Sequence, residues 1–162
     1  MTQSPEMLAI SMGLDLPDFD RDGYYGAGYG TMKPYHRVGS LVFLSGHVAQ
    51  LGTTITHKGR LGAGLTTAQG YAAARQTGIN VLGGIRQAVG SLDRVRSIVR
   101  TLNFVVCTPE FEEVHLVSSG LSDLLVEVFG PARGLGGRAT IGVMALAGGV
   151  CFETWATVEV AD

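Results

Sequence analysis

The segment from Thr66 to Gly90 constrains the fold of this chain more than any other. Thr66 and Gln69 have the spacing of a helix capping box, and Gly90 is a typical residue to end a helix. Apolar side chains recur between them with a roughly helical period: Tyr71, Ala72, Ile79, Leu82, Ile85 and Val89. Four glycines also lie in this segment, and each costs a helix interior about 1 kcal/mol relative to alanine. We therefore expect a long helix whose backbone another element approaches closely.

Apolar segments on both sides of this helix predict β-strands. Gly39 and Ser40 separate PYHRV from LVFLSG, a pattern typical of a β-hairpin. LVFLS is almost entirely apolar, so we expect this strand inside a sheet. Residues 51–64 form a polar, glycine-rich connector, and RSIVRTLNFVVC after the helix predicts a buried strand.

The last third of the chain predicts a second helical region and a second hairpin. Thr108 followed by Pro109 favours a helix start, because threonine is a good N-cap and proline suits the first helical position. Four apolar side chains share one helical face, and Gly130 ends the helix; the four are Leu121, Leu124, Leu125 and Val128. RATIGVMAL and VCFETWATVEV flank a turn at residues 147–149 and predict a β-hairpin.

The resulting order is strand, strand, helix, strand, helix, strand, strand. It predicts an α+β sandwich, a mixed sheet with two helices packed on one face. Residues 24–162 are expected to form a single domain, as is usual for this length. Residues 1–23 are polar and acidic near their end, so we expect a loosely ordered arm.

Composition excludes several classes of function. Charged residues make up 16% of the chain and the net charge is −2, which disfavours nucleic-acid binding and favours self-association. No apolar segment is long enough to cross a membrane, and the N-terminal residues lack the features of a signal peptide. Cys107 and Cys151 are isolated in apolar runs, and the four histidines lack metal-binding spacing. We therefore expect a cytoplasmic protein without a metal.

Arg138 and Glu153 are the clearest candidates for a catalytic or binding role. One lies on each strand of the expected hairpin. A guanidinium can hold a carboxylate by two parallel hydrogen bonds. A partly buried carboxylate can act as general acid or base on a water molecule. The residues alone favour the plainer interpretation, in which Arg138 is a sheet-edge arginine paired to any acid and Glu153 is an outward-facing glutamate.

Several segments resemble the reactive-intermediate deaminase family, also known as the YjgF-like, Rid or endoribonuclease L-PSP family. They are LVFLSGHVAQ, TLNFVVCTPEFEEV, VEVFG and GRATIGVMALAGGVCFETWATVEV, within a match from about Pro34 to Val160. The resemblance implies a chorismate-mutase-like fold and a homotrimer with active sites at subunit interfaces. It also implies hydrolysis of enamine or imine acids such as 2-aminoacrylate to a 2-keto acid and ammonia, without metal or organic cofactor.

The resemblance assigns the catalytic pair and its neighbours. The family's arginine lies fifteen residues before its glutamate, which selects Arg138 with Glu153 and excludes Arg133 in the PAR sequence. Arg138 is then the ligand of the substrate carboxylate. Glu153, with Tyr35 of the PY pair or a backbone carbonyl, is expected to position and deprotonate the attacking water. Ser45 of the SG pair is a further candidate for substrate binding.

Two positions depart from the family pattern. Thr140 stands where the best-known members often have cysteine, and it remains a candidate for substrate binding. The family's helix asparagine has no clear counterpart: spacing from Phe111 selects His115, whereas the extra residues before VEVFG leave Ser119 and Ser122 open. The extra residues before VEVFG, together with LA in place of the family's LP pair, indicate a divergent subgroup, so the resemblance does not identify the substrate.

Three alternatives and one geometric expectation follow. The chain could be a non-catalytic carboxylate-binding or regulatory protein, or a pathway enzyme acting on an aminomuconate-like enamine; ribonuclease activity is disfavoured by the net acidic charge.

In the expected hairpin, Arg138 and Glu153 lie about 16 Å apart in one chain, too far to contact one small substrate. We therefore expect a site shared between neighbouring subunits.

Overall fold

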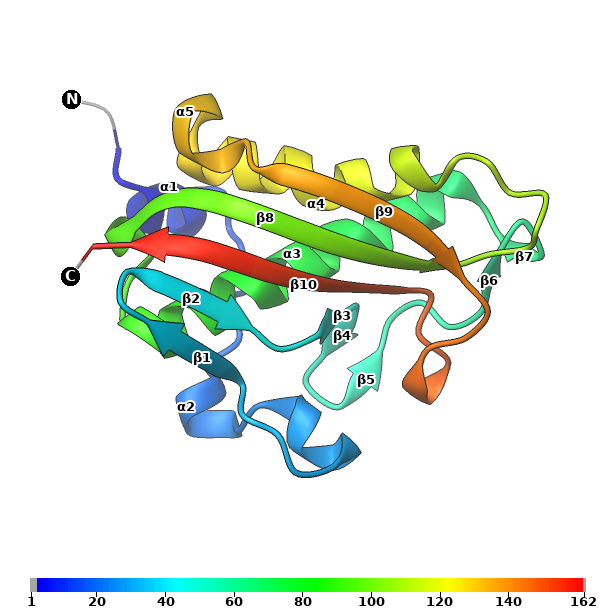
Figure 1. Cartoon of the computed structure of the whole chain (residues 1–162), viewed down its shortest axis with the longest axis horizontal. Coiled ribbons are helices and arrows are strands. Elements are labelled where there is room, and N and C mark those ends of the chain that lie inside the picture. Colours follow the sequence, from blue (N-terminus) through cyan, green and yellow to red (C-terminus); the bar gives the residue numbers. More distant parts are fainter. Residues whose placement is uncertain (1–2, 162) are drawn as a thin grey trace.

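The main sheet of the computed structural model, which describes residues 3–161, has the strand order β1-β2-β10-β8-β9 (Figure 1). Its strands are β1 (Tyr35–Val38), β2 (Leu41–Leu44), β8 (Val95–Val106), β9 (Gly137–Val143) and β10 (Phe152–Val160), with β3 (His47–Val48) also pairing with β10. Helices α3 (Thr67–Val89) and α4 (Val114–Phe129) pack against one face of this sheet. The expected α+β sandwich with a mixed sheet and two helices on one face is confirmed.

Short elements complete the chain. Two short helices, α1 (Pro5–Ser11) and α2 (Phe19–Asp22), and the 3₁₀-helix η1 (Tyr25–Tyr29) precede the sheet. The expected connector contains β4 (Gln50–Leu51), β5 (Thr54–Ile55), β6 (Arg60–Leu61) and β7 (Gly64–Leu65). The remaining elements are η2 (Leu92–Arg94), α5 (Pro131–Gly134) and η3 (Ala147–Gly149).

The first hairpin and the long helix form as expected. β1 and β2 are antiparallel neighbours, and Gly39 has a φ of 58° at their turn, a conformation that glycine adopts without strain. β2 lies between β1 and β10, inside the sheet. Thr66 and Gln69 form the complete capping box of α3, and Gly90 ends it in the left-handed conformation.

Close packing between helices accounts for glycines in α3 and α4. A Cβ atom on Gly120 of α4 would lie 2.1 Å from the carbonyl oxygen of Tyr71, which belongs to α3. A Cβ on Gly78 would lie 2.8 Å from the side chain of Leu124 on α4. The two helices therefore meet almost backbone to backbone, with the apolar core between them and the sheet.

The second helix starts later than the sequence indicates. α4 begins at Val114, and Pro109 and Glu110 form a turn that the Phe111 N–H closes by donating to the Thr108 carbonyl at 3.1 Å. The Thr108 N–H donates to the carbonyl of Leu61, which holds this residue beside β6 rather than at a helix cap. From Val114 the helix continues without a break to Phe129.

The expected hairpin between the last two strands is wrong. β9 pairs in parallel with β8, and β10 pairs antiparallel with the other edge of β8. β8 is twelve residues long and lies between the two strands. The connection holds the end of β8 from both sides: Cys107 N–H donates to Val143 O, and Val106 N–H donates to Cys151 O. The glycine turn between the two segments of alternating hydrophobicity is therefore part of a connection that crosses β8, and it does not close a hairpin.

The N-terminal segment is folded against the domain, unlike the loose arm that we expected. Ser4 caps α1, and the Glu6 carboxylate accepts a hydrogen bond from the Leu92 N–H at 2.8 Å. In return, the Glu6 N–H donates to the Asp93 carboxylate at 2.9 Å. Ala9 and Phe19 are buried. Residues 1 and 2 lie outside the described part of the chain.

Candidate functional site

Glu153 lines a cavity of about 180 Å³ on the sheet face that the helices leave open. It lies on β10, where Phe152, Thr154 and Ala156 point into the core, so that Glu153 and Trp155 point the other way. The Trp155 indole N–H donates to Glu153 Oε1 at 2.7 Å. This bond orients the carboxylate, and Glu153 Oε2 makes no hydrogen bond with any residue in the range 3–161.

Three tyrosines of the N-terminal segment also line this cavity: Tyr24, Tyr25 and Tyr29. The Tyr24 hydroxyl donates to the Gly46 carbonyl at 2.5 Å, and the Tyr25 hydroxyl accepts from the Val48 N–H at 3.0 Å. Burial, reinforced by the nearby Glu153 carboxylate, raises the pKa of Tyr24 well above its ordinary value. Burial also raises the pKa of Tyr25. Both phenols therefore stay protonated at neutral pH.

Gly46 gives the Glu153 carboxylate its space. A Cβ atom at this position would lie 2.3 Å from Glu153 Oε1 and 3.3 Å from Trp155 Nε1. Only a residue without a side chain allows the carboxylate to lie against this backbone. The glycine of the SG pair therefore has a direct steric role beside Glu153.

Arg138 lies on the other face of the sheet, at its edge. It pairs with Thr101, whose side chain is buried, and its guanidinium donates to the hydroxyls of Ser119 and Ser122 on α4 at 3.3 and 3.2 Å. No carboxylate of residues 3–161 forms a salt bridge with Arg138. A small cavity of about 170 Å³ adjoins it. The guanidinium is thus held in place with its charge uncompensated.

The structure distinguishes the three candidates for the family's helix asparagine by position. Ser119 and Ser122 contact the Arg138 guanidinium, whereas the hydrogen bonds of His115 are made by its carbonyl, which accepts from Ser118 and Ser119. His115 is exposed one turn before Ser119. Proximity to Arg138 therefore favours the two serines.

Thr140 belongs to a buried polar network rather than to an open pocket. Its hydroxyl donates to Ser118 Oγ at 2.8 Å and accepts from the Asn103 amide at 3.5 Å. Asn103 Oδ1 in turn accepts from the Thr154 hydroxyl at 2.6 Å. The network links β10, β8, β9 and α4, and thereby holds these elements in position next to Arg138.

The other two predicted residues lie near the first hairpin. Tyr35 pairs with the buried Leu44 and packs against the core, so its ring lies on the helix side of the sheet, opposite to Glu153. The Ser45 hydroxyl donates to the Lys33 carbonyl and closes the segment before β1. Within one chain the structure therefore does not bring Tyr35 and Ser45 together with Arg138.

Arg138 and Glu153 are far apart within one chain. Arg138 pairs with Thr101 and Glu153 with Phe104, three positions further along β8 and on its opposite edge. Standard strand geometry then separates their backbones by about 14 Å. The two side chains also point to opposite faces of the sheet.

The tyrosines beside Glu153 are the part of the site that sequence reasoning missed. Tyr24, Tyr25 and Tyr29 belong to YYGAGYG, which resembles a glycine-rich phosphate loop but lacks the lysine and the βα unit of one. The available signal was the density of tyrosines around small residues. Gly26 shows why small residues stand between these tyrosines, because a Cβ at this position would lie 2.1 Å from the Tyr24 ring.

Other kinds of site find little support in the described part of the chain. Among residues 3–161, no group of three histidine, cysteine, aspartate or glutamate side chains could hold a metal ion. No helix within that range is both long and apolar enough to cross a membrane.

The comparisons with known proteins agree with this fold. Residues 6–152 match the family model described as "YjgF/chorismate mutase-like, putative endoribonuclease". A solved Shewanella oneidensis structure, described as a "putative endoribonuclease", is 30% identical with a TM-score of 0.88, covering 98% of this chain and all of that one.

Two further proteins are similar in sequence or fold. Protein TCP17 of Trypanosoma cruzi is 42% identical over 101 residues, which is 62% of this chain and 63% of that protein, so the match spans less than two thirds of its length. The RidA structure from Psychrobacter sp. PAMC 21119 is 21% identical with a TM-score of 0.55, over 81% of this chain and 89% of that one, and shares the fold. The expected chorismate-mutase-like fold is thus confirmed, and the chain belongs to the YjgF/chorismate mutase-like family.

Proposed function

We propose that this protein hydrolyses a small enamine or imine acid to a 2-keto acid and ammonia. The observation that carries the proposal is the uncompensated guanidinium of Arg138, which Ser119 and Ser122 hold at the sheet edge. A fixed guanidinium without a carboxylate partner suits a planar substrate carboxylate. The family relationship and the half-buried carboxylate of Glu153 support the same chemistry.

The proposed reaction needs one water and one group that moves protons. After the enamine tautomerises to the imine, Glu153 accepts a proton from water while the oxygen bonds to the imine carbon. The protonated carboxyl then returns this proton to nitrogen, which gives a carbinolamine. Glu153 next accepts the proton of the carbinolamine hydroxyl and passes it to the amino group, so that the C–N bond breaks and ammonia leaves as the C=O bond forms. Such imines already hydrolyse in water, so positioning and proton transfer through one carboxylate supply sufficient acceleration.

The cavity around Glu153 suits this role. Its tyrosine rings limit the water that reaches the carboxylate, and their faces attract the positive charge of a protonated imine. Tyr24 and Tyr25 are neutral at pH 7, as tyrosines ordinarily are, and burial raises the pKa of both further. Charge at the site therefore resides on Glu153.

Ammonia release from freshly generated 2-iminopropionate tests the proposal. Arg138→Ala is expected to remove most acceleration, because a lost charge-assisted pair costs about 2–5 kcal/mol. Arg133→Ala is the matched control: this arginine lies in α5 and makes only a 3.5 Å contact to the Val95 carbonyl. It should retain near-normal turnover.

The assay also separates the alternatives. Affinity for small 2-keto acids without any acceleration of ammonia release would indicate a non-catalytic carboxylate-binding protein instead. A requirement for Arg133 with Arg138 dispensable would overturn the assignment of the carboxylate ligand. Acceleration confined to longer, unsaturated enamine acids would favour the pathway-specific alternative.

A further inference from the structure

The cavity beside Glu153 is larger than the NH group of an unsubstituted imine needs. Its volume is about 180 Å³, and of the described residues that line it, Glu153 alone carries a charge. A cavity of about 150 Å³ with apolar walls is large enough to hold benzene. The space next to the carboxylate can therefore take several carbon atoms of a ligand.

The rest of the lining offers an apolar surface. Its other side chains are aromatic or aliphatic: Tyr24, Tyr25, Tyr29, Met32, Val48 and Ala147. The Tyr24 hydroxyl uses its hydrogen in the bond to the Gly46 carbonyl, and the Tyr25 hydroxyl accepts from the Val48 N–H. A ligand in this cavity therefore meets one carboxylate and, around it, aromatic and aliphatic carbon.

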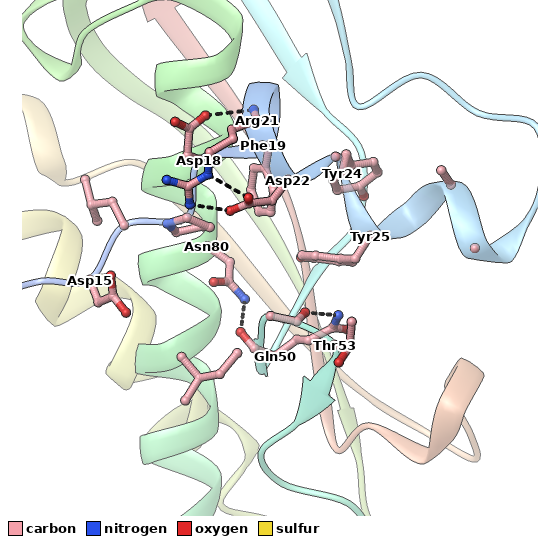
Figure 2. A pocket seen from close by; sticks show the side chains of 17 residues that line it. Asp15, Asp18, Phe19, Arg21, Asp22, Tyr24, Tyr25, Gln50, Thr53 and Asn80 are labelled. Atoms are coloured by element: carbon pink, nitrogen blue, oxygen red, sulfur yellow. Dashed lines mark hydrogen bonds and ion pairs between the residues drawn. The ribbon is translucent and has the colours of Figure 1, made fainter.

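Two of the three tyrosines are held in place by their surroundings. Tyr24 and Tyr25 also line a larger cleft of about 550 Å³, where Figure 2 shows their side chains, so they form the wall between the two spaces. Their ring centroids are 4.9 Å apart, and both rings pack against His47. Tyr29 is 48% exposed, and a Cβ on Gly148 would lie 2.9 Å from its hydroxyl oxygen. Tyr29 can therefore be replaced without opening the core.

The proposed reaction brings the substrate nitrogen to this cavity. Glu153 returns a proton to the nitrogen, so the two groups must come within hydrogen-bond distance. The Trp155 indole occupies Glu153 Oε1 at 2.7 Å, which leaves Oε2 for the substrate. The substrate carboxylate is directed elsewhere, because Arg138 does not line the cavity. A substituent on the nitrogen would thus lie among the tyrosines.

On the basis of the proposed function, we propose that the substrate carries a small alkyl group on its imine nitrogen, so that a primary alkylamine leaves instead of ammonia. Alkyl carbons on a charged nitrogen share its positive charge, which aromatic faces attract, and they fill the apolar space. Water adds to the iminium carbon, and Glu153 carries two protons in turn from that oxygen to the nitrogen. The C–N bond breaks as the C=O bond forms, giving a 2-keto acid and an alkylammonium ion without any oxidant or reductant.

Three imines test the inference: N-methyl-2-iminopropionate, its isomer 2-iminobutyrate, and 2-iminopropionate, which lacks the extra methyl group. Each is generated in the assay by oxidation of the corresponding amino acid, and release of the 2-keto acid is followed. After subtraction of the spontaneous rate, kcat/KM for the N-methyl imine should exceed that for 2-iminopropionate by about fourfold or more, the effect of burying one methyl group. 2-Iminobutyrate should show no such gain.

Two variants locate the effect. Ala147→Leu fills the cavity from the exposed η3 turn and should abolish the gain for the N-methyl imine. Tyr29→Leu keeps an apolar side chain but removes an aromatic face, so it should lower the gain by about two- to fivefold. Tyr71→Leu is the matched control, because this partly exposed tyrosine lies on α3 outside the cavity, and it should keep the gain. A ratio of two substrates is insensitive to the amount of folded protein.

An equal gain for 2-iminobutyrate would place the carbon side chain in the cavity and overturn the inference. No gain in the native protein, or a gain that survives Ala147→Leu, would overturn it as well. Calorimetric binding of N-methylalanine and its isomer 2-aminobutyrate needs no turnover, and the former should bind about fourfold more tightly. Equal binding of these isomers would overturn the inference even if imines are hydrolysed, whereas failure to accelerate any imine would overturn the proposed function.

Discussion

His47 is a titratable residue that is buried in the interior of the protein. Its ring is fully buried among Phe19, Tyr24 and Tyr25, and Nδ1 lies 2.7 Å from the Ser45 carbonyl. Nε2 has no partner in the described structure and lies against Gly84, where an added Cβ would be 2.5 Å from it. Burial, opposed by the Ser45 hydrogen bond, lowers the pKa of His47 to about 4. The folded protein therefore keeps this imidazole neutral.

This environment predicts acid sensitivity. The unfolded chain binds a proton at His47 below about pH 6.5, whereas the folded chain binds it only near pH 4. The free energy of unfolding should therefore fall as the pH drops from 6.5 to 4, by at most about 3 kcal/mol. Urea unfolding at several pH values measures this fall, and His47→Gln should flatten it. The same slope in both proteins would assign the acid sensitivity to other groups.

The residues of the site differ in how far the sequence could predict them. The resemblance to the family was needed to select Arg138 and Glu153 as a pair. His115, Ser119 and Ser122 remained alternatives until α4 was seen to place the two serines at Arg138. The tyrosines of residues 24–29 could not be assigned, because their contact with Glu153 joins distant parts of the chain. No periodic pattern in the sequence indicates a contact of this kind.

At the scale of elements, the crossing of α3 and α4 depends on Gly120. A methyl group there must displace the α3 backbone at Tyr71 and Arg75, since the added Cβ would lie 2.1 and 3.0 Å from their backbone atoms. Gly120→Ala should therefore destabilise the protein by about 1–3 kcal/mol, despite the higher helix propensity of alanine. Denaturant unfolding measures the loss. Gly28→Ala, whose Cβ would meet nothing within 4 Å, should be nearly neutral.

Element order could be predicted from the sequence, but strand pairing at the end of the chain could not. Local alternation identified both β9 and β10, and the Ala147–Gly149 turn suggested that they pair. β8 lies between them because its two edges pair with both. Pairing between strands distant in sequence depends on the whole sheet, and helix starts such as Val114 depend on tertiary contacts as well as on caps.

At the scale of the whole molecule, the open sheet face predicts self-association. Phe43, Ile141 and Trp155 on this face are each between 44% and 51% exposed. An apolar face of this kind is typical of a surface that binds a partner. We expect a homotrimer, with a mass by light scattering near three times the 17.0 kDa of one chain. A mass near one chain at micromolar concentration would exclude it.

The separation of Arg138 and Glu153 in one chain determines how the proposed active site must be assembled. Arg138 and Glu153 lie on opposite faces and about 14 Å apart in one chain, so one small substrate can reach both only between subunits. Arg138→Ala and Glu153→Ala should each be inactive as homotrimers. After subunit exchange in an equal mixture, about a quarter of the interfaces should receive both intact side chains, and ammonia release should recover accordingly. Exchange is verified independently with fluorescently labelled chains, and exchange without any recovery would show that the two residues do not share a site.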